Sequence, residues 1–266
     1  MKRLRWISVW VLAVSFLTAC ATPSPVIDRA KSRGTLVVGT AASMPPLNMK
    51  AKDGRIMGYD ADLARLIARY MGVDLKLEAM AFSDLLPALE AGKIDMIISG
   101  MTMTPERNLK VAFVGPYMVS GKSVLTKLAT LIKVDDLSKI NTPAAKLAAL
   151  KGSTSEAFIQ LALPKATLVT VNNYDEGVAL VMEDKVHAMV ADHQTCLYYV
   201  VRYPDKDLAA LVTPFTYEPL GIAVPPDDPL LVNWLGNLMK SLEGMGEMNT
   251  LFNRWFKDGS WLKEMP

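Results

Sequence analysis

Short apolar runs alternate with stretches of helical periodicity through the first half of the chain. Residues 35–39 and 94–98 are short and mainly apolar, as buried strands are, and residues 73–77 alternate as a strand does. A helix is predicted between the strands 35–39 and 73–77. Its apolar residues stand at helical spacing, namely Leu63, Leu66, Ile67, Tyr70 and Met71. Gly72 is expected to end this helix. The alternation predicts a parallel sheet covered by helices.

A second unit of the same kind follows an extended segment over residues 119–127. Its predicted strands and helices, in chain order, are 146–150, 153–163, 167–171, 174–184, 187–191 and 193–201. The chain then returns to an apolar strand at 220–224, and residues 230–256 are helical with a break at 244–246. Two α/β units joined by two crossings predict a two-lobed molecule. A ligand would bind between the lobes, at the carboxyl ends of both sheets.

The first 19 residues have the pattern of a signal peptide. Three basic residues in the first five positions precede an apolar run over residues 6–17, which is shorter than the about 20 residues of a membrane span. The run ends in Leu17-Thr18-Ala19-Cys20, which is similar to a bacterial lipobox. Cysteine is also common in apolar segments, but its position after a complete signal pattern favours lipidation of Cys20. We therefore expect residues 20–33 to form a tether between the lipid and the fold.

Composition and charge limit the classes of function. The chain has 266 residues, 51% of them hydrophobic, and a formal net charge of +2. Removal of the signal peptide removes three positive charges and no negative one, which leaves −1, so the basicity belongs to the leader and predicts no nucleic-acid partner. His187 and His193 offer no metal cluster, and no cofactor is predicted. Cys196 is expected to be a small buried residue, without a disulfide partner if Cys20 is acylated.

The segment after residue 98 combines features of an anion site. Gly100 permits a tight backbone bend, Thr104 is a candidate helix N-cap, and Pro105 suits the first helical position. A strand end that faces a helix start can bind a carboxylate through backbone N–H groups, the Thr102 hydroxyl and the Arg107 guanidinium. An ordinary connecting loop with a solvated arginine is the alternative, and the segment alone favours that alternative.

A wider pattern favours the anion site. The segment GKIDMIISGMTMTPER, followed by FVGPY, resembles the signature of the family-3 extracytoplasmic solute-binding proteins of amino-acid ABC transporters. The resemblance also includes residues 34–40, 58–63, 86–89, 151–156, 188–192 and 255–256. It implies the type II periplasmic-binding-protein fold, an α/β fold of two lobes, each a mixed sheet with flanking helices, joined by a two-strand hinge. The boundaries we expect are 34–118 plus 219–266 for lobe 1, 124–212 for lobe 2, and 119–123 and 213–218 for the hinge crossings.

The resemblance also implies how a ligand is held. An amino acid is a zwitterion, so a closed site must neutralise both of its ends. The family assigns the ligand carboxylate to the position of Arg107, with donors from residues 100–102 and from Ser153 and Thr154 in the second lobe. It assigns the ligand ammonium to the position of Asp192. The alternative for Asp192 is an N-cap of the following helix.

The wall that faces the ligand side chain is expected to be apolar. Met44, Phe82 and Met101 stand at or next to the matching positions, although methionine is often core filler. The family usually has an aromatic residue near Met44 and often an acid near Ala41, and this chain has neither. Because no acid stands where a cationic ligand needs one, a neutral amino acid is expected.

Glu156 raises the possibility of catalysis. Some periplasmic dehydratases share the implied fold, and a buried Glu156 could act as a general acid or base. The sequence Ser153-x-x-Glu156 is also a capping box, and we prefer this structural role.

The function we expect is therefore that of a lipid-anchored, monomeric periplasmic protein. It captures an amino acid and delivers it to the permease of an ABC importer. A cyclohexadienyl dehydratase-like enzyme that uses Glu156 is the alternative. A purely structural or signalling lipoprotein is the third possibility, and the joint presence of Arg107 and Asp192 disfavours it.

Overall fold

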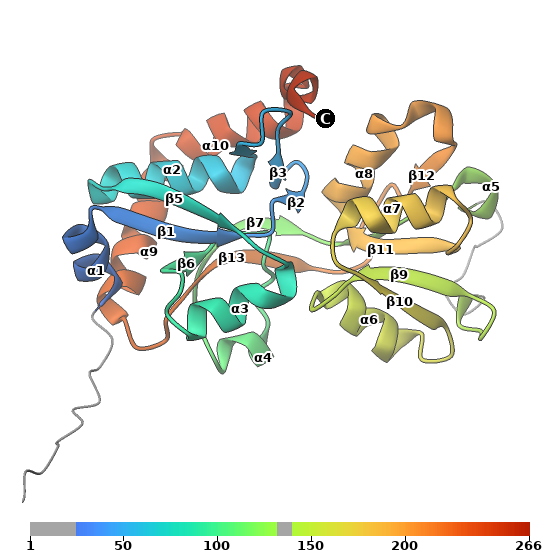
Figure 1. The fold of residues 1–266 in the computed structure, drawn as a ribbon, viewed down its shortest axis with the longest axis horizontal. Helices are drawn as coiled ribbons and strands as arrows, with labels where there is room; N and C mark the ends of the chain where they lie inside the picture. Colours follow the sequence, from blue (N-terminus) through green and yellow to red (C-terminus); the bar gives the residue numbers. More distant parts are fainter. Residues whose placement is uncertain (1–24, 132–139) are drawn as a thin grey trace, which may run out of the picture.

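The computed structural model describes residues 25–131 and 140–266. Figure 1 shows two lobes side by side, each with a five-stranded mixed sheet and helices on its faces, so the predicted two-lobed α/β fold is confirmed. The signal peptide, Cys20 and the start of the tether lie outside the described residues. Within the described part of the chain, no helix has the length and apolar composition of a membrane span.

The first lobe is built on a sheet with the strand order β5-β1-β6-β13-β7. Its strands are β1 (Thr35–Thr40), β5 (Asp74–Ala79), β6 (Met96–Ile97), β7 (Ala112–Ser120) and β13 (Glu218–Val224). Strand β1 pairs in parallel with β5 and β6, whereas β13 runs antiparallel between β6 and β7. A second, small antiparallel sheet consists of β2 (Ser43–Met44), β3 (Asn48–Lys50) and β4 (Ile56–Met57).

Helices cover this sheet, and the last two of them belong to the C-terminal part of the chain. They are α1 (Val26–Arg33), α2 (Tyr59–Met71), α3 (Phe82–Glu90), α4 (Pro105–Asn108), α9 (Pro229–Gly244) and α10 (Glu247–Phe252), followed by the short segments η3 (Asn253–Lys257) and η4 (Ser260–Glu264). The predicted break in the C-terminal helix is confirmed at Gly246, which has φ 78° and separates α9 from α10.

The second lobe repeats the arrangement with the strand order β10-β9-β11-β8-β12. Its strands are β8 (Lys122–Lys127), β9 (Lys146–Leu150), β10 (Thr167–Val171), β11 (Ala188–Asp192) and β12 (Leu208–Ala210). Its helices are α5 (Leu128–Leu131), α6 (Thr154–Ala162), α7 (Tyr174–Met182), α8 (His193–Arg202) and the 3₁₀ turn η2 (Pro204–Lys206). Strand β9 pairs in parallel with β10 and β11, and β8 runs antiparallel to β11 and β12.

The apolar face predicted for α2 packs into the core with one exception. Leu63, Ile67 and Met71 are buried, and Gly72, at φ 72°, ends the helix as expected. The spacing also places Tyr70 on this face, but its side chain is 48% exposed. A phenol ring can pack along its apolar edge while its hydroxyl stays in water, so helical spacing alone does not bury it.

The predicted tether over residues 20–33 includes a helix of the folded domain, so its C-terminal boundary is wrong. Residues 26–33 are helical, and Gly34 ends the helix with φ 72°. Val26 and Ala30, four positions apart, are the buried residues of α1. Such a short and mostly polar segment gives little periodic signal, because its contact with the fold depends on two side chains.

Asp95 fixes α1 to the sheet. Its buried carboxylate accepts hydrogen bonds from Arg29 at 2.8 Å and from Arg33, both on α1. It also accepts a hydrogen bond from the backbone N–H of Val37 in β1 at 2.8 Å. This role explains an acid inside the apolar run that contains β6, because the carboxylate has a partner for each oxygen.

The chain crosses between the lobes at two adjacent places. Strand β7 ends at Ser120, and β8 begins at Lys122 in the other sheet, while β13 begins at Glu218 opposite Ser120 (Figure 1). A Cβ on Gly121 would lie 2.3 Å from the carbonyl oxygen of Thr216, so the two crossings pack too closely for a larger residue there. The backbone N–H of Lys122 donates to the Thr216 hydroxyl at 2.8 Å.

Candidate ligand-binding site

The loop after β6 has the local geometry that its residues predict. Gly100 has φ 57°, in the left-handed region, and a Cβ there would lie 2.9 Å from the Leu47 side chain. Thr104 accepts a hydrogen bond from the Arg107 N–H at 3.2 Å and caps α4, whose first residue is Pro105. This capped turn fixes the backbone from which the Arg107 side chain extends.

A buried carboxyl group positions this loop. The Tyr117 hydroxyl donates to Asp60 Oδ1 at 2.9 Å and accepts a hydrogen bond from the Gly100 N–H at 3.1 Å. The Asn48 amide donates to Asp60 Oδ2 at 2.8 Å. Burial raises the pKa of Asp60 to about 6, although the hydrogen bonds from Asn48 and Tyr117 act in the opposite direction. Asp60 therefore acts through Tyr117 on the backbone of the loop.

Arg107 connects the two lobes. Its Nη1 donates to the Thr102 carbonyl at 2.8 Å, and its Nη2 donates to the Gly152 carbonyl of the second lobe at 3.0 Å. The guanidinium also lies over the Phe82 ring, 5.6 Å from its centroid. Burial lowers the pKa of Arg107, and the negative charge of Glu218 opposes this change. The two hydrogen bonds use two of five N–H donors, which leaves donors for a carboxylate.

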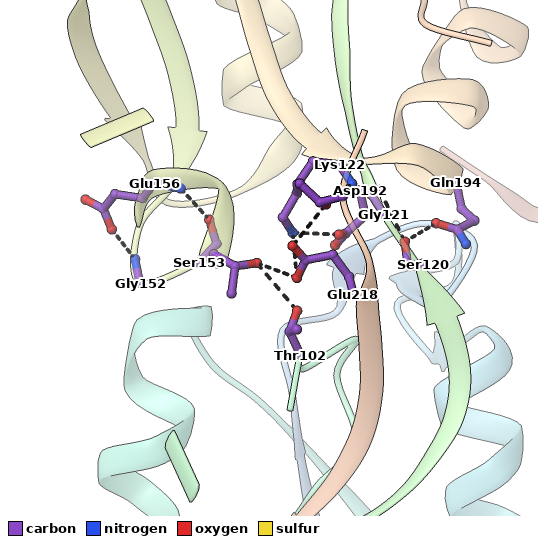
Figure 2. Close-up of polar contacts among 12 residues, drawn as sticks. Thr102, Ser120, Gly121, Lys122, Gly152, Ser153, Glu156, Asp192, Gln194 and Glu218 are labelled. Atoms are coloured by element: carbon purple, nitrogen blue, oxygen red, sulfur yellow. Dashed lines mark hydrogen bonds and ion pairs between the residues drawn. The ribbon is translucent and has the colours of Figure 1, made fainter. Parts of the chain in front are cut away.

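Hydroxyl groups form further contacts between the lobes, on the side of Arg107 that faces the crossings. Figure 2 shows Thr102 of the first lobe and Thr154 of the second with their hydroxyls facing each other, and the two oxygens are 3.4 Å apart. The Thr154 hydroxyl donates to Glu218 Oε2 at 3.1 Å. The other oxygen of Glu218, Oε1, accepts a hydrogen bond from Thr216 at 3.1 Å. Glu218, at the start of β13, therefore joins a hydroxyl of the second lobe to a hydroxyl of the crossing segment.

A buried lysine lies at the end of this chain of contacts. Lys122 Nζ lies 2.7 Å from Asp192 Oδ1 and 3.7 Å from Glu218 Oε2 (Figure 2). The side chains of Lys122 and Asp192 are only 2% and 3% exposed. Buried ions need close partners, because the loss of hydration costs several kcal/mol for each ion. Lys122, Asp192 and Glu218 thus form one ionic cluster, which we call the crossing triad.

Asp192 does not act as a helix cap. It stands at the N-cap position of α8, but its side chain makes no capping hydrogen bond. Its Oδ1 accepts from Lys122, and Oδ2 receives no hydrogen bond from any described residue. The N-cap alternative for this side chain is therefore wrong, and one carboxylate oxygen remains for another donor.

Ser153 and Glu156 form a variant of the predicted capping box, in which the Glu156 carboxylate accepts the N–H of Gly152 instead of that of the N-cap residue Ser153. The Ser153 hydroxyl accepts a hydrogen bond from the Glu156 N–H at 3.2 Å at the start of α6. The Glu156 carboxylate accepts a hydrogen bond from the Gly152 N–H at 2.6 Å. Figure 2 shows the Glu156 carboxylate directed away from the crossing triad. Ser153 and Glu156 are thus engaged in local structure at the edge of the site.

The predicted apolar wall is divided between site and core. Phe82, the first residue of α3, contacts the Arg107 guanidinium. Met44 and Met101 belong to the hydrophobic core, with exposed fractions of 1% and 0%. The Met44 methyl group lies close to Gly100, where a Cβ would come within 3.0 Å of it. Met44 therefore supports the loop that carries the anion-binding groups, and Met101 is a buried residue of that loop.

The structure adds three polar residues that the sequence analysis does not select: Lys122, Glu218 and Tyr174. Tyr174 begins α7, is fully buried, and has no hydrogen-bond partner for its hydroxyl among the described residues. Burial raises its pKa well above the usual value, and the charges of Asp192 and Glu218 add to this rise. A lysine and a glutamate at the first positions of the mostly buried strands β8 and β13 are the available sequence signal, since buried positions are seldom charged without a partner.

Two mixed sheets joined by crossing strands, with polar side chains of both lobes meeting between them, define the architecture of a two-lobed ligand-binding protein. Residues 36–258 match the model of the bacterial extracellular solute-binding proteins, family 3, and the chain belongs to this family. The family predicted from the sequence is thereby confirmed.

Individual relatives have different ligands in their names. The chain is 29% identical to the ABC transporter glutamine-binding protein GlnH of Bacillus subtilis (strain 168), over 86% of this chain and 83% of that protein. It is also similar to a solved binding component of an ABC transporter from Wolinella succinogenes DSM 1740 complexed with lysine, with 36% identity, a TM-score of 0.82, and coverage of 87% and 99%. A third similar structure is the ancestral amino acid-binding protein AncCDT-1, a precursor of cyclohexadienyl dehydratase, with 37% identity, a TM-score of 0.81, and coverage of 86% and 99%.

Proposed function

We propose that this protein captures a neutral amino acid between its lobes and delivers it to the permease of an ABC importer. The observation that carries the proposal is the polar chain from Arg107 to Asp192, which crosses from one lobe to the other and passes through Thr102, Thr154, Glu218 and Lys122. It offers a cationic group at one end and an anionic group at the other. A buried zwitterion requires both.

Specific roles follow for the site residues. Arg107 binds the ligand carboxylate with its remaining N–H donors, and the backbone of Gly100 and the Thr102 and Thr154 hydroxyls add further donors. The free oxygen of Asp192 accepts the ligand ammonium. The glutamine- and lysine-binding relatives support an amino acid as the ligand class.

The preference for a neutral ligand rests on the positions that match the side-chain wall of the family. Ala41, Met44, Phe82 and Met101 stand at or next to these positions and carry no charge, so they offer no partner to a cationic side chain. An unpaired ammonium or guanidinium in a closed site would be costly. An apolar or amide side chain has no such requirement.

The cellular setting is part of the same proposal. Residues 1–19 are a signal peptide, and Cys20 carries a lipid that holds a monomeric protein at the periplasmic face of a membrane. Lobe 1 (34–118 with 219–266) and lobe 2 (124–212) close as near-rigid bodies about the crossings at 119–123 and 213–218.

A thermal-shift screen of the mature domain against all proteinogenic L-amino acids tests the proposal. At a hundredfold excess over its Kd, a ligand stabilises the folded state by about 2.7 kcal/mol. We expect the largest rise in unfolding temperature with one or a few neutral amino acids. The proposal fails if no L-amino acid raises the unfolding temperature.

The similarity to a precursor of cyclohexadienyl dehydratase makes a dehydratase the second candidate. The capping role of Glu156 argues against it, because the carboxylate already accepts the Gly152 N–H. Prephenate and arogenate should therefore be recovered unchanged after incubation with the protein. Turnover that disappears in a folded Glu156→Gln variant would favour the enzyme.

A further inference from the structure

The ammonium of Lys122 already occupies part of the acidic end of the site. Its Nζ lies between Asp192 and Glu218, at 2.7 Å and 3.7 Å from their carboxylate oxygens, and its side chain is buried. A ligand that binds next to this triad therefore meets two carboxylates and one ammonium group of the protein itself. The charge that the ligand can bring depends on the cation as much as on the carboxylates.

The charges of the polar chain are balanced. Arg107 and Lys122 are cationic, and Asp192 and Glu218 are anionic, so these four groups sum to zero. A zwitterion leaves the sum at zero when it is enclosed. A cationic or an acidic amino acid adds one uncompensated charge to a buried region, where solvent screening is weak.

Asp192 keeps one carboxylate oxygen that Lys122 does not use. Asp192 Oδ2 receives no hydrogen bond from any described residue. The Tyr174 hydroxyl is fully buried and unpaired among the described residues, and Asp192 and Glu218 are near enough for their charges to raise its pKa. Oδ2 of Asp192 can therefore accept a ligand ammonium while Oδ1 keeps its contact with Lys122, and the Tyr174 hydroxyl is a further polar group on this side.

We propose that Lys122 and Glu218 are specificity-determining residues that set the net charge of the bound amino acid. Lys122 excludes cationic amino acids by supplying the second positive charge of the site, and Glu218 compensates that charge so that neutral ligands are accepted. This inference rests on the proposed function, because it assigns the charge class of the ligand for the same site.

Three variants change the charge sum in a planned way. Lys122→Met lowers the sum to −1 and should shift preference toward L-lysine and L-arginine. Glu218→Gln raises it to +1 and should shift preference toward L-glutamate and L-aspartate. The double variant Lys122→Met/Glu218→Gln restores zero and should return to neutral amino acids. In Glu218→Gln the 2.7 Å contact between Lys122 and Asp192 remains, so this variant tests the idea even if Lys122→Met does not fold.

The measurement is calorimetric titration of the parent and each variant with L-lysine, L-glutamate and the neutral amino acid that the parent binds. The affinity ratio of lysine to the neutral ligand should rise at least about thirtyfold in Lys122→Met, as is typical of a buried charge partner. Lys127→Met is the matched control. It makes the same substitution on the same strand, in a lysine that pairs with the exposed Asp184 at 2.5 Å, and it should leave all ratios unchanged.

The outcomes separate the inference from the proposed function. The same order of ligands in the parent, Glu218→Gln and the double variant overturns the inference but leaves amino-acid binding intact. Loss of neutral-ligand binding in both Lys122→Met and the double variant, without a gain of lysine binding, also overturns it, because Lys122 would then be a direct ligand contact. Absence of amino-acid binding by the parent and all variants instead contradicts the proposed function.

Discussion

Lys122 and Asp192 lie directly opposite each other on neighbouring antiparallel strands, with Lys122 Nζ 2.7 Å from Asp192 Oδ1. Lys122 is the first residue of β8 and Asp192 is the last residue of β11. The pair therefore lies at the end of these two strands where the chain enters the second sheet. Ser120 and Glu218 are paired in the same way in the first sheet, where β7 ends and β13 begins. Strand register therefore places the charged residues of both sheets at the crossings, where the two lobes meet.

The first prediction concerns the pH dependence of stability. The pKa of Asp60 is raised to about 6 in the folded protein, against about 3.9 in an unfolded chain. Near pH 3 both states keep the proton and no penalty exists. Between about pH 4 and 6 the unfolded state loses its proton first, so the free energy of unfolding falls as pH rises. Above pH 6 the penalty stays at its full value, on the order of 3 kcal/mol.

Asp60→Asn should remove this contribution, since the Asn48 amide can rotate to offer its unpaired buried oxygen to the new amide group. Urea unfolding from pH 4 to 8 measures the difference between variant and parent. The variant should gain stability relative to the parent as pH rises. Asp74→Asn, at an exposed position, is the control and should follow the parent. Parallel curves for Asp60→Asn and the parent would refute a raised pKa.

The second prediction concerns the attachment of α1. Asp95→Ala removes the acceptor for Arg29 and Arg33 and leaves the Val37 N–H without its partner. The two arginines can return to water, so the main cost is the unpaired buried N–H and the lost charged hydrogen bonds. We expect a loss of about 1–3 kcal/mol in urea unfolding. Asp53→Ala, in an exposed pair with Arg55, should leave stability nearly unchanged. Equal effects of the two substitutions would argue against an anchoring role.

The order of strands and helices is predicted well from the sequence, because it depends on the local periodicity of apolar residues. Gly72 ends α2, and Gly246 lies between α9 and α10, at the positions where the apolar pattern stops. The same reasoning fails for α1, which is held by Val26 and Ala30 and by a carboxylate 62 and 66 positions away on Asp95. Local patterns contain no information on such distant partners.

Some residues of the candidate site are likewise predictable from local sequence, and others are not. Arg107 and its capped turn are predictable, since Thr104 and Pro105 precede it within one turn. Lys122 is not, because its partner Asp192 is 70 positions away and meets it through strand register alone. Register depends on the whole sheet, so a single sequence indicates a charged residue at a strand end without indicating its partner.

The third prediction concerns lobe closure. Arg107 binds the Gly152 carbonyl, and Gly152 lies so near Ser83 that a Cβ would be 3.2 Å from the Ser83 Cα. These contacts join the lobes, so ligand that bridges them should favour a compact form. Small-angle scattering should show a smaller radius of gyration for the parent with saturating ligand, and no change for Arg107→Ala at the same ligand concentration. An unchanged radius for the parent, with saturation proven by calorimetry, would count against closure.

The fourth prediction concerns the membrane anchor, which lies outside the described residues. Cys20→Ser should move the protein from the membrane fraction to the soluble extracytoplasmic fraction, because the serine cannot receive the lipid. Cys196→Ser is the matched control and should stay with the membrane, since Cys196 is buried in the second lobe. Membrane association of Cys20→Ser at the level of the parent would show that the lipobox interpretation is wrong.

Binding of an amino acid between Arg107 and Asp192 is tested most directly by calorimetric titration of Arg107→Ala and Asp192→Asn with the neutral ligand of the parent. Loss of one partner of a buried charged contact costs about 2–5 kcal/mol, so each variant should bind roughly thirty to several thousand times more weakly. Arg69→Ala, at an exposed position on α2, should bind as the parent does. The decarboxylated amine of the same ligand should depend on Asp192 and hardly on Arg107. Affinity within about threefold of the parent for either site variant would contradict the placement of the ligand between these two residues.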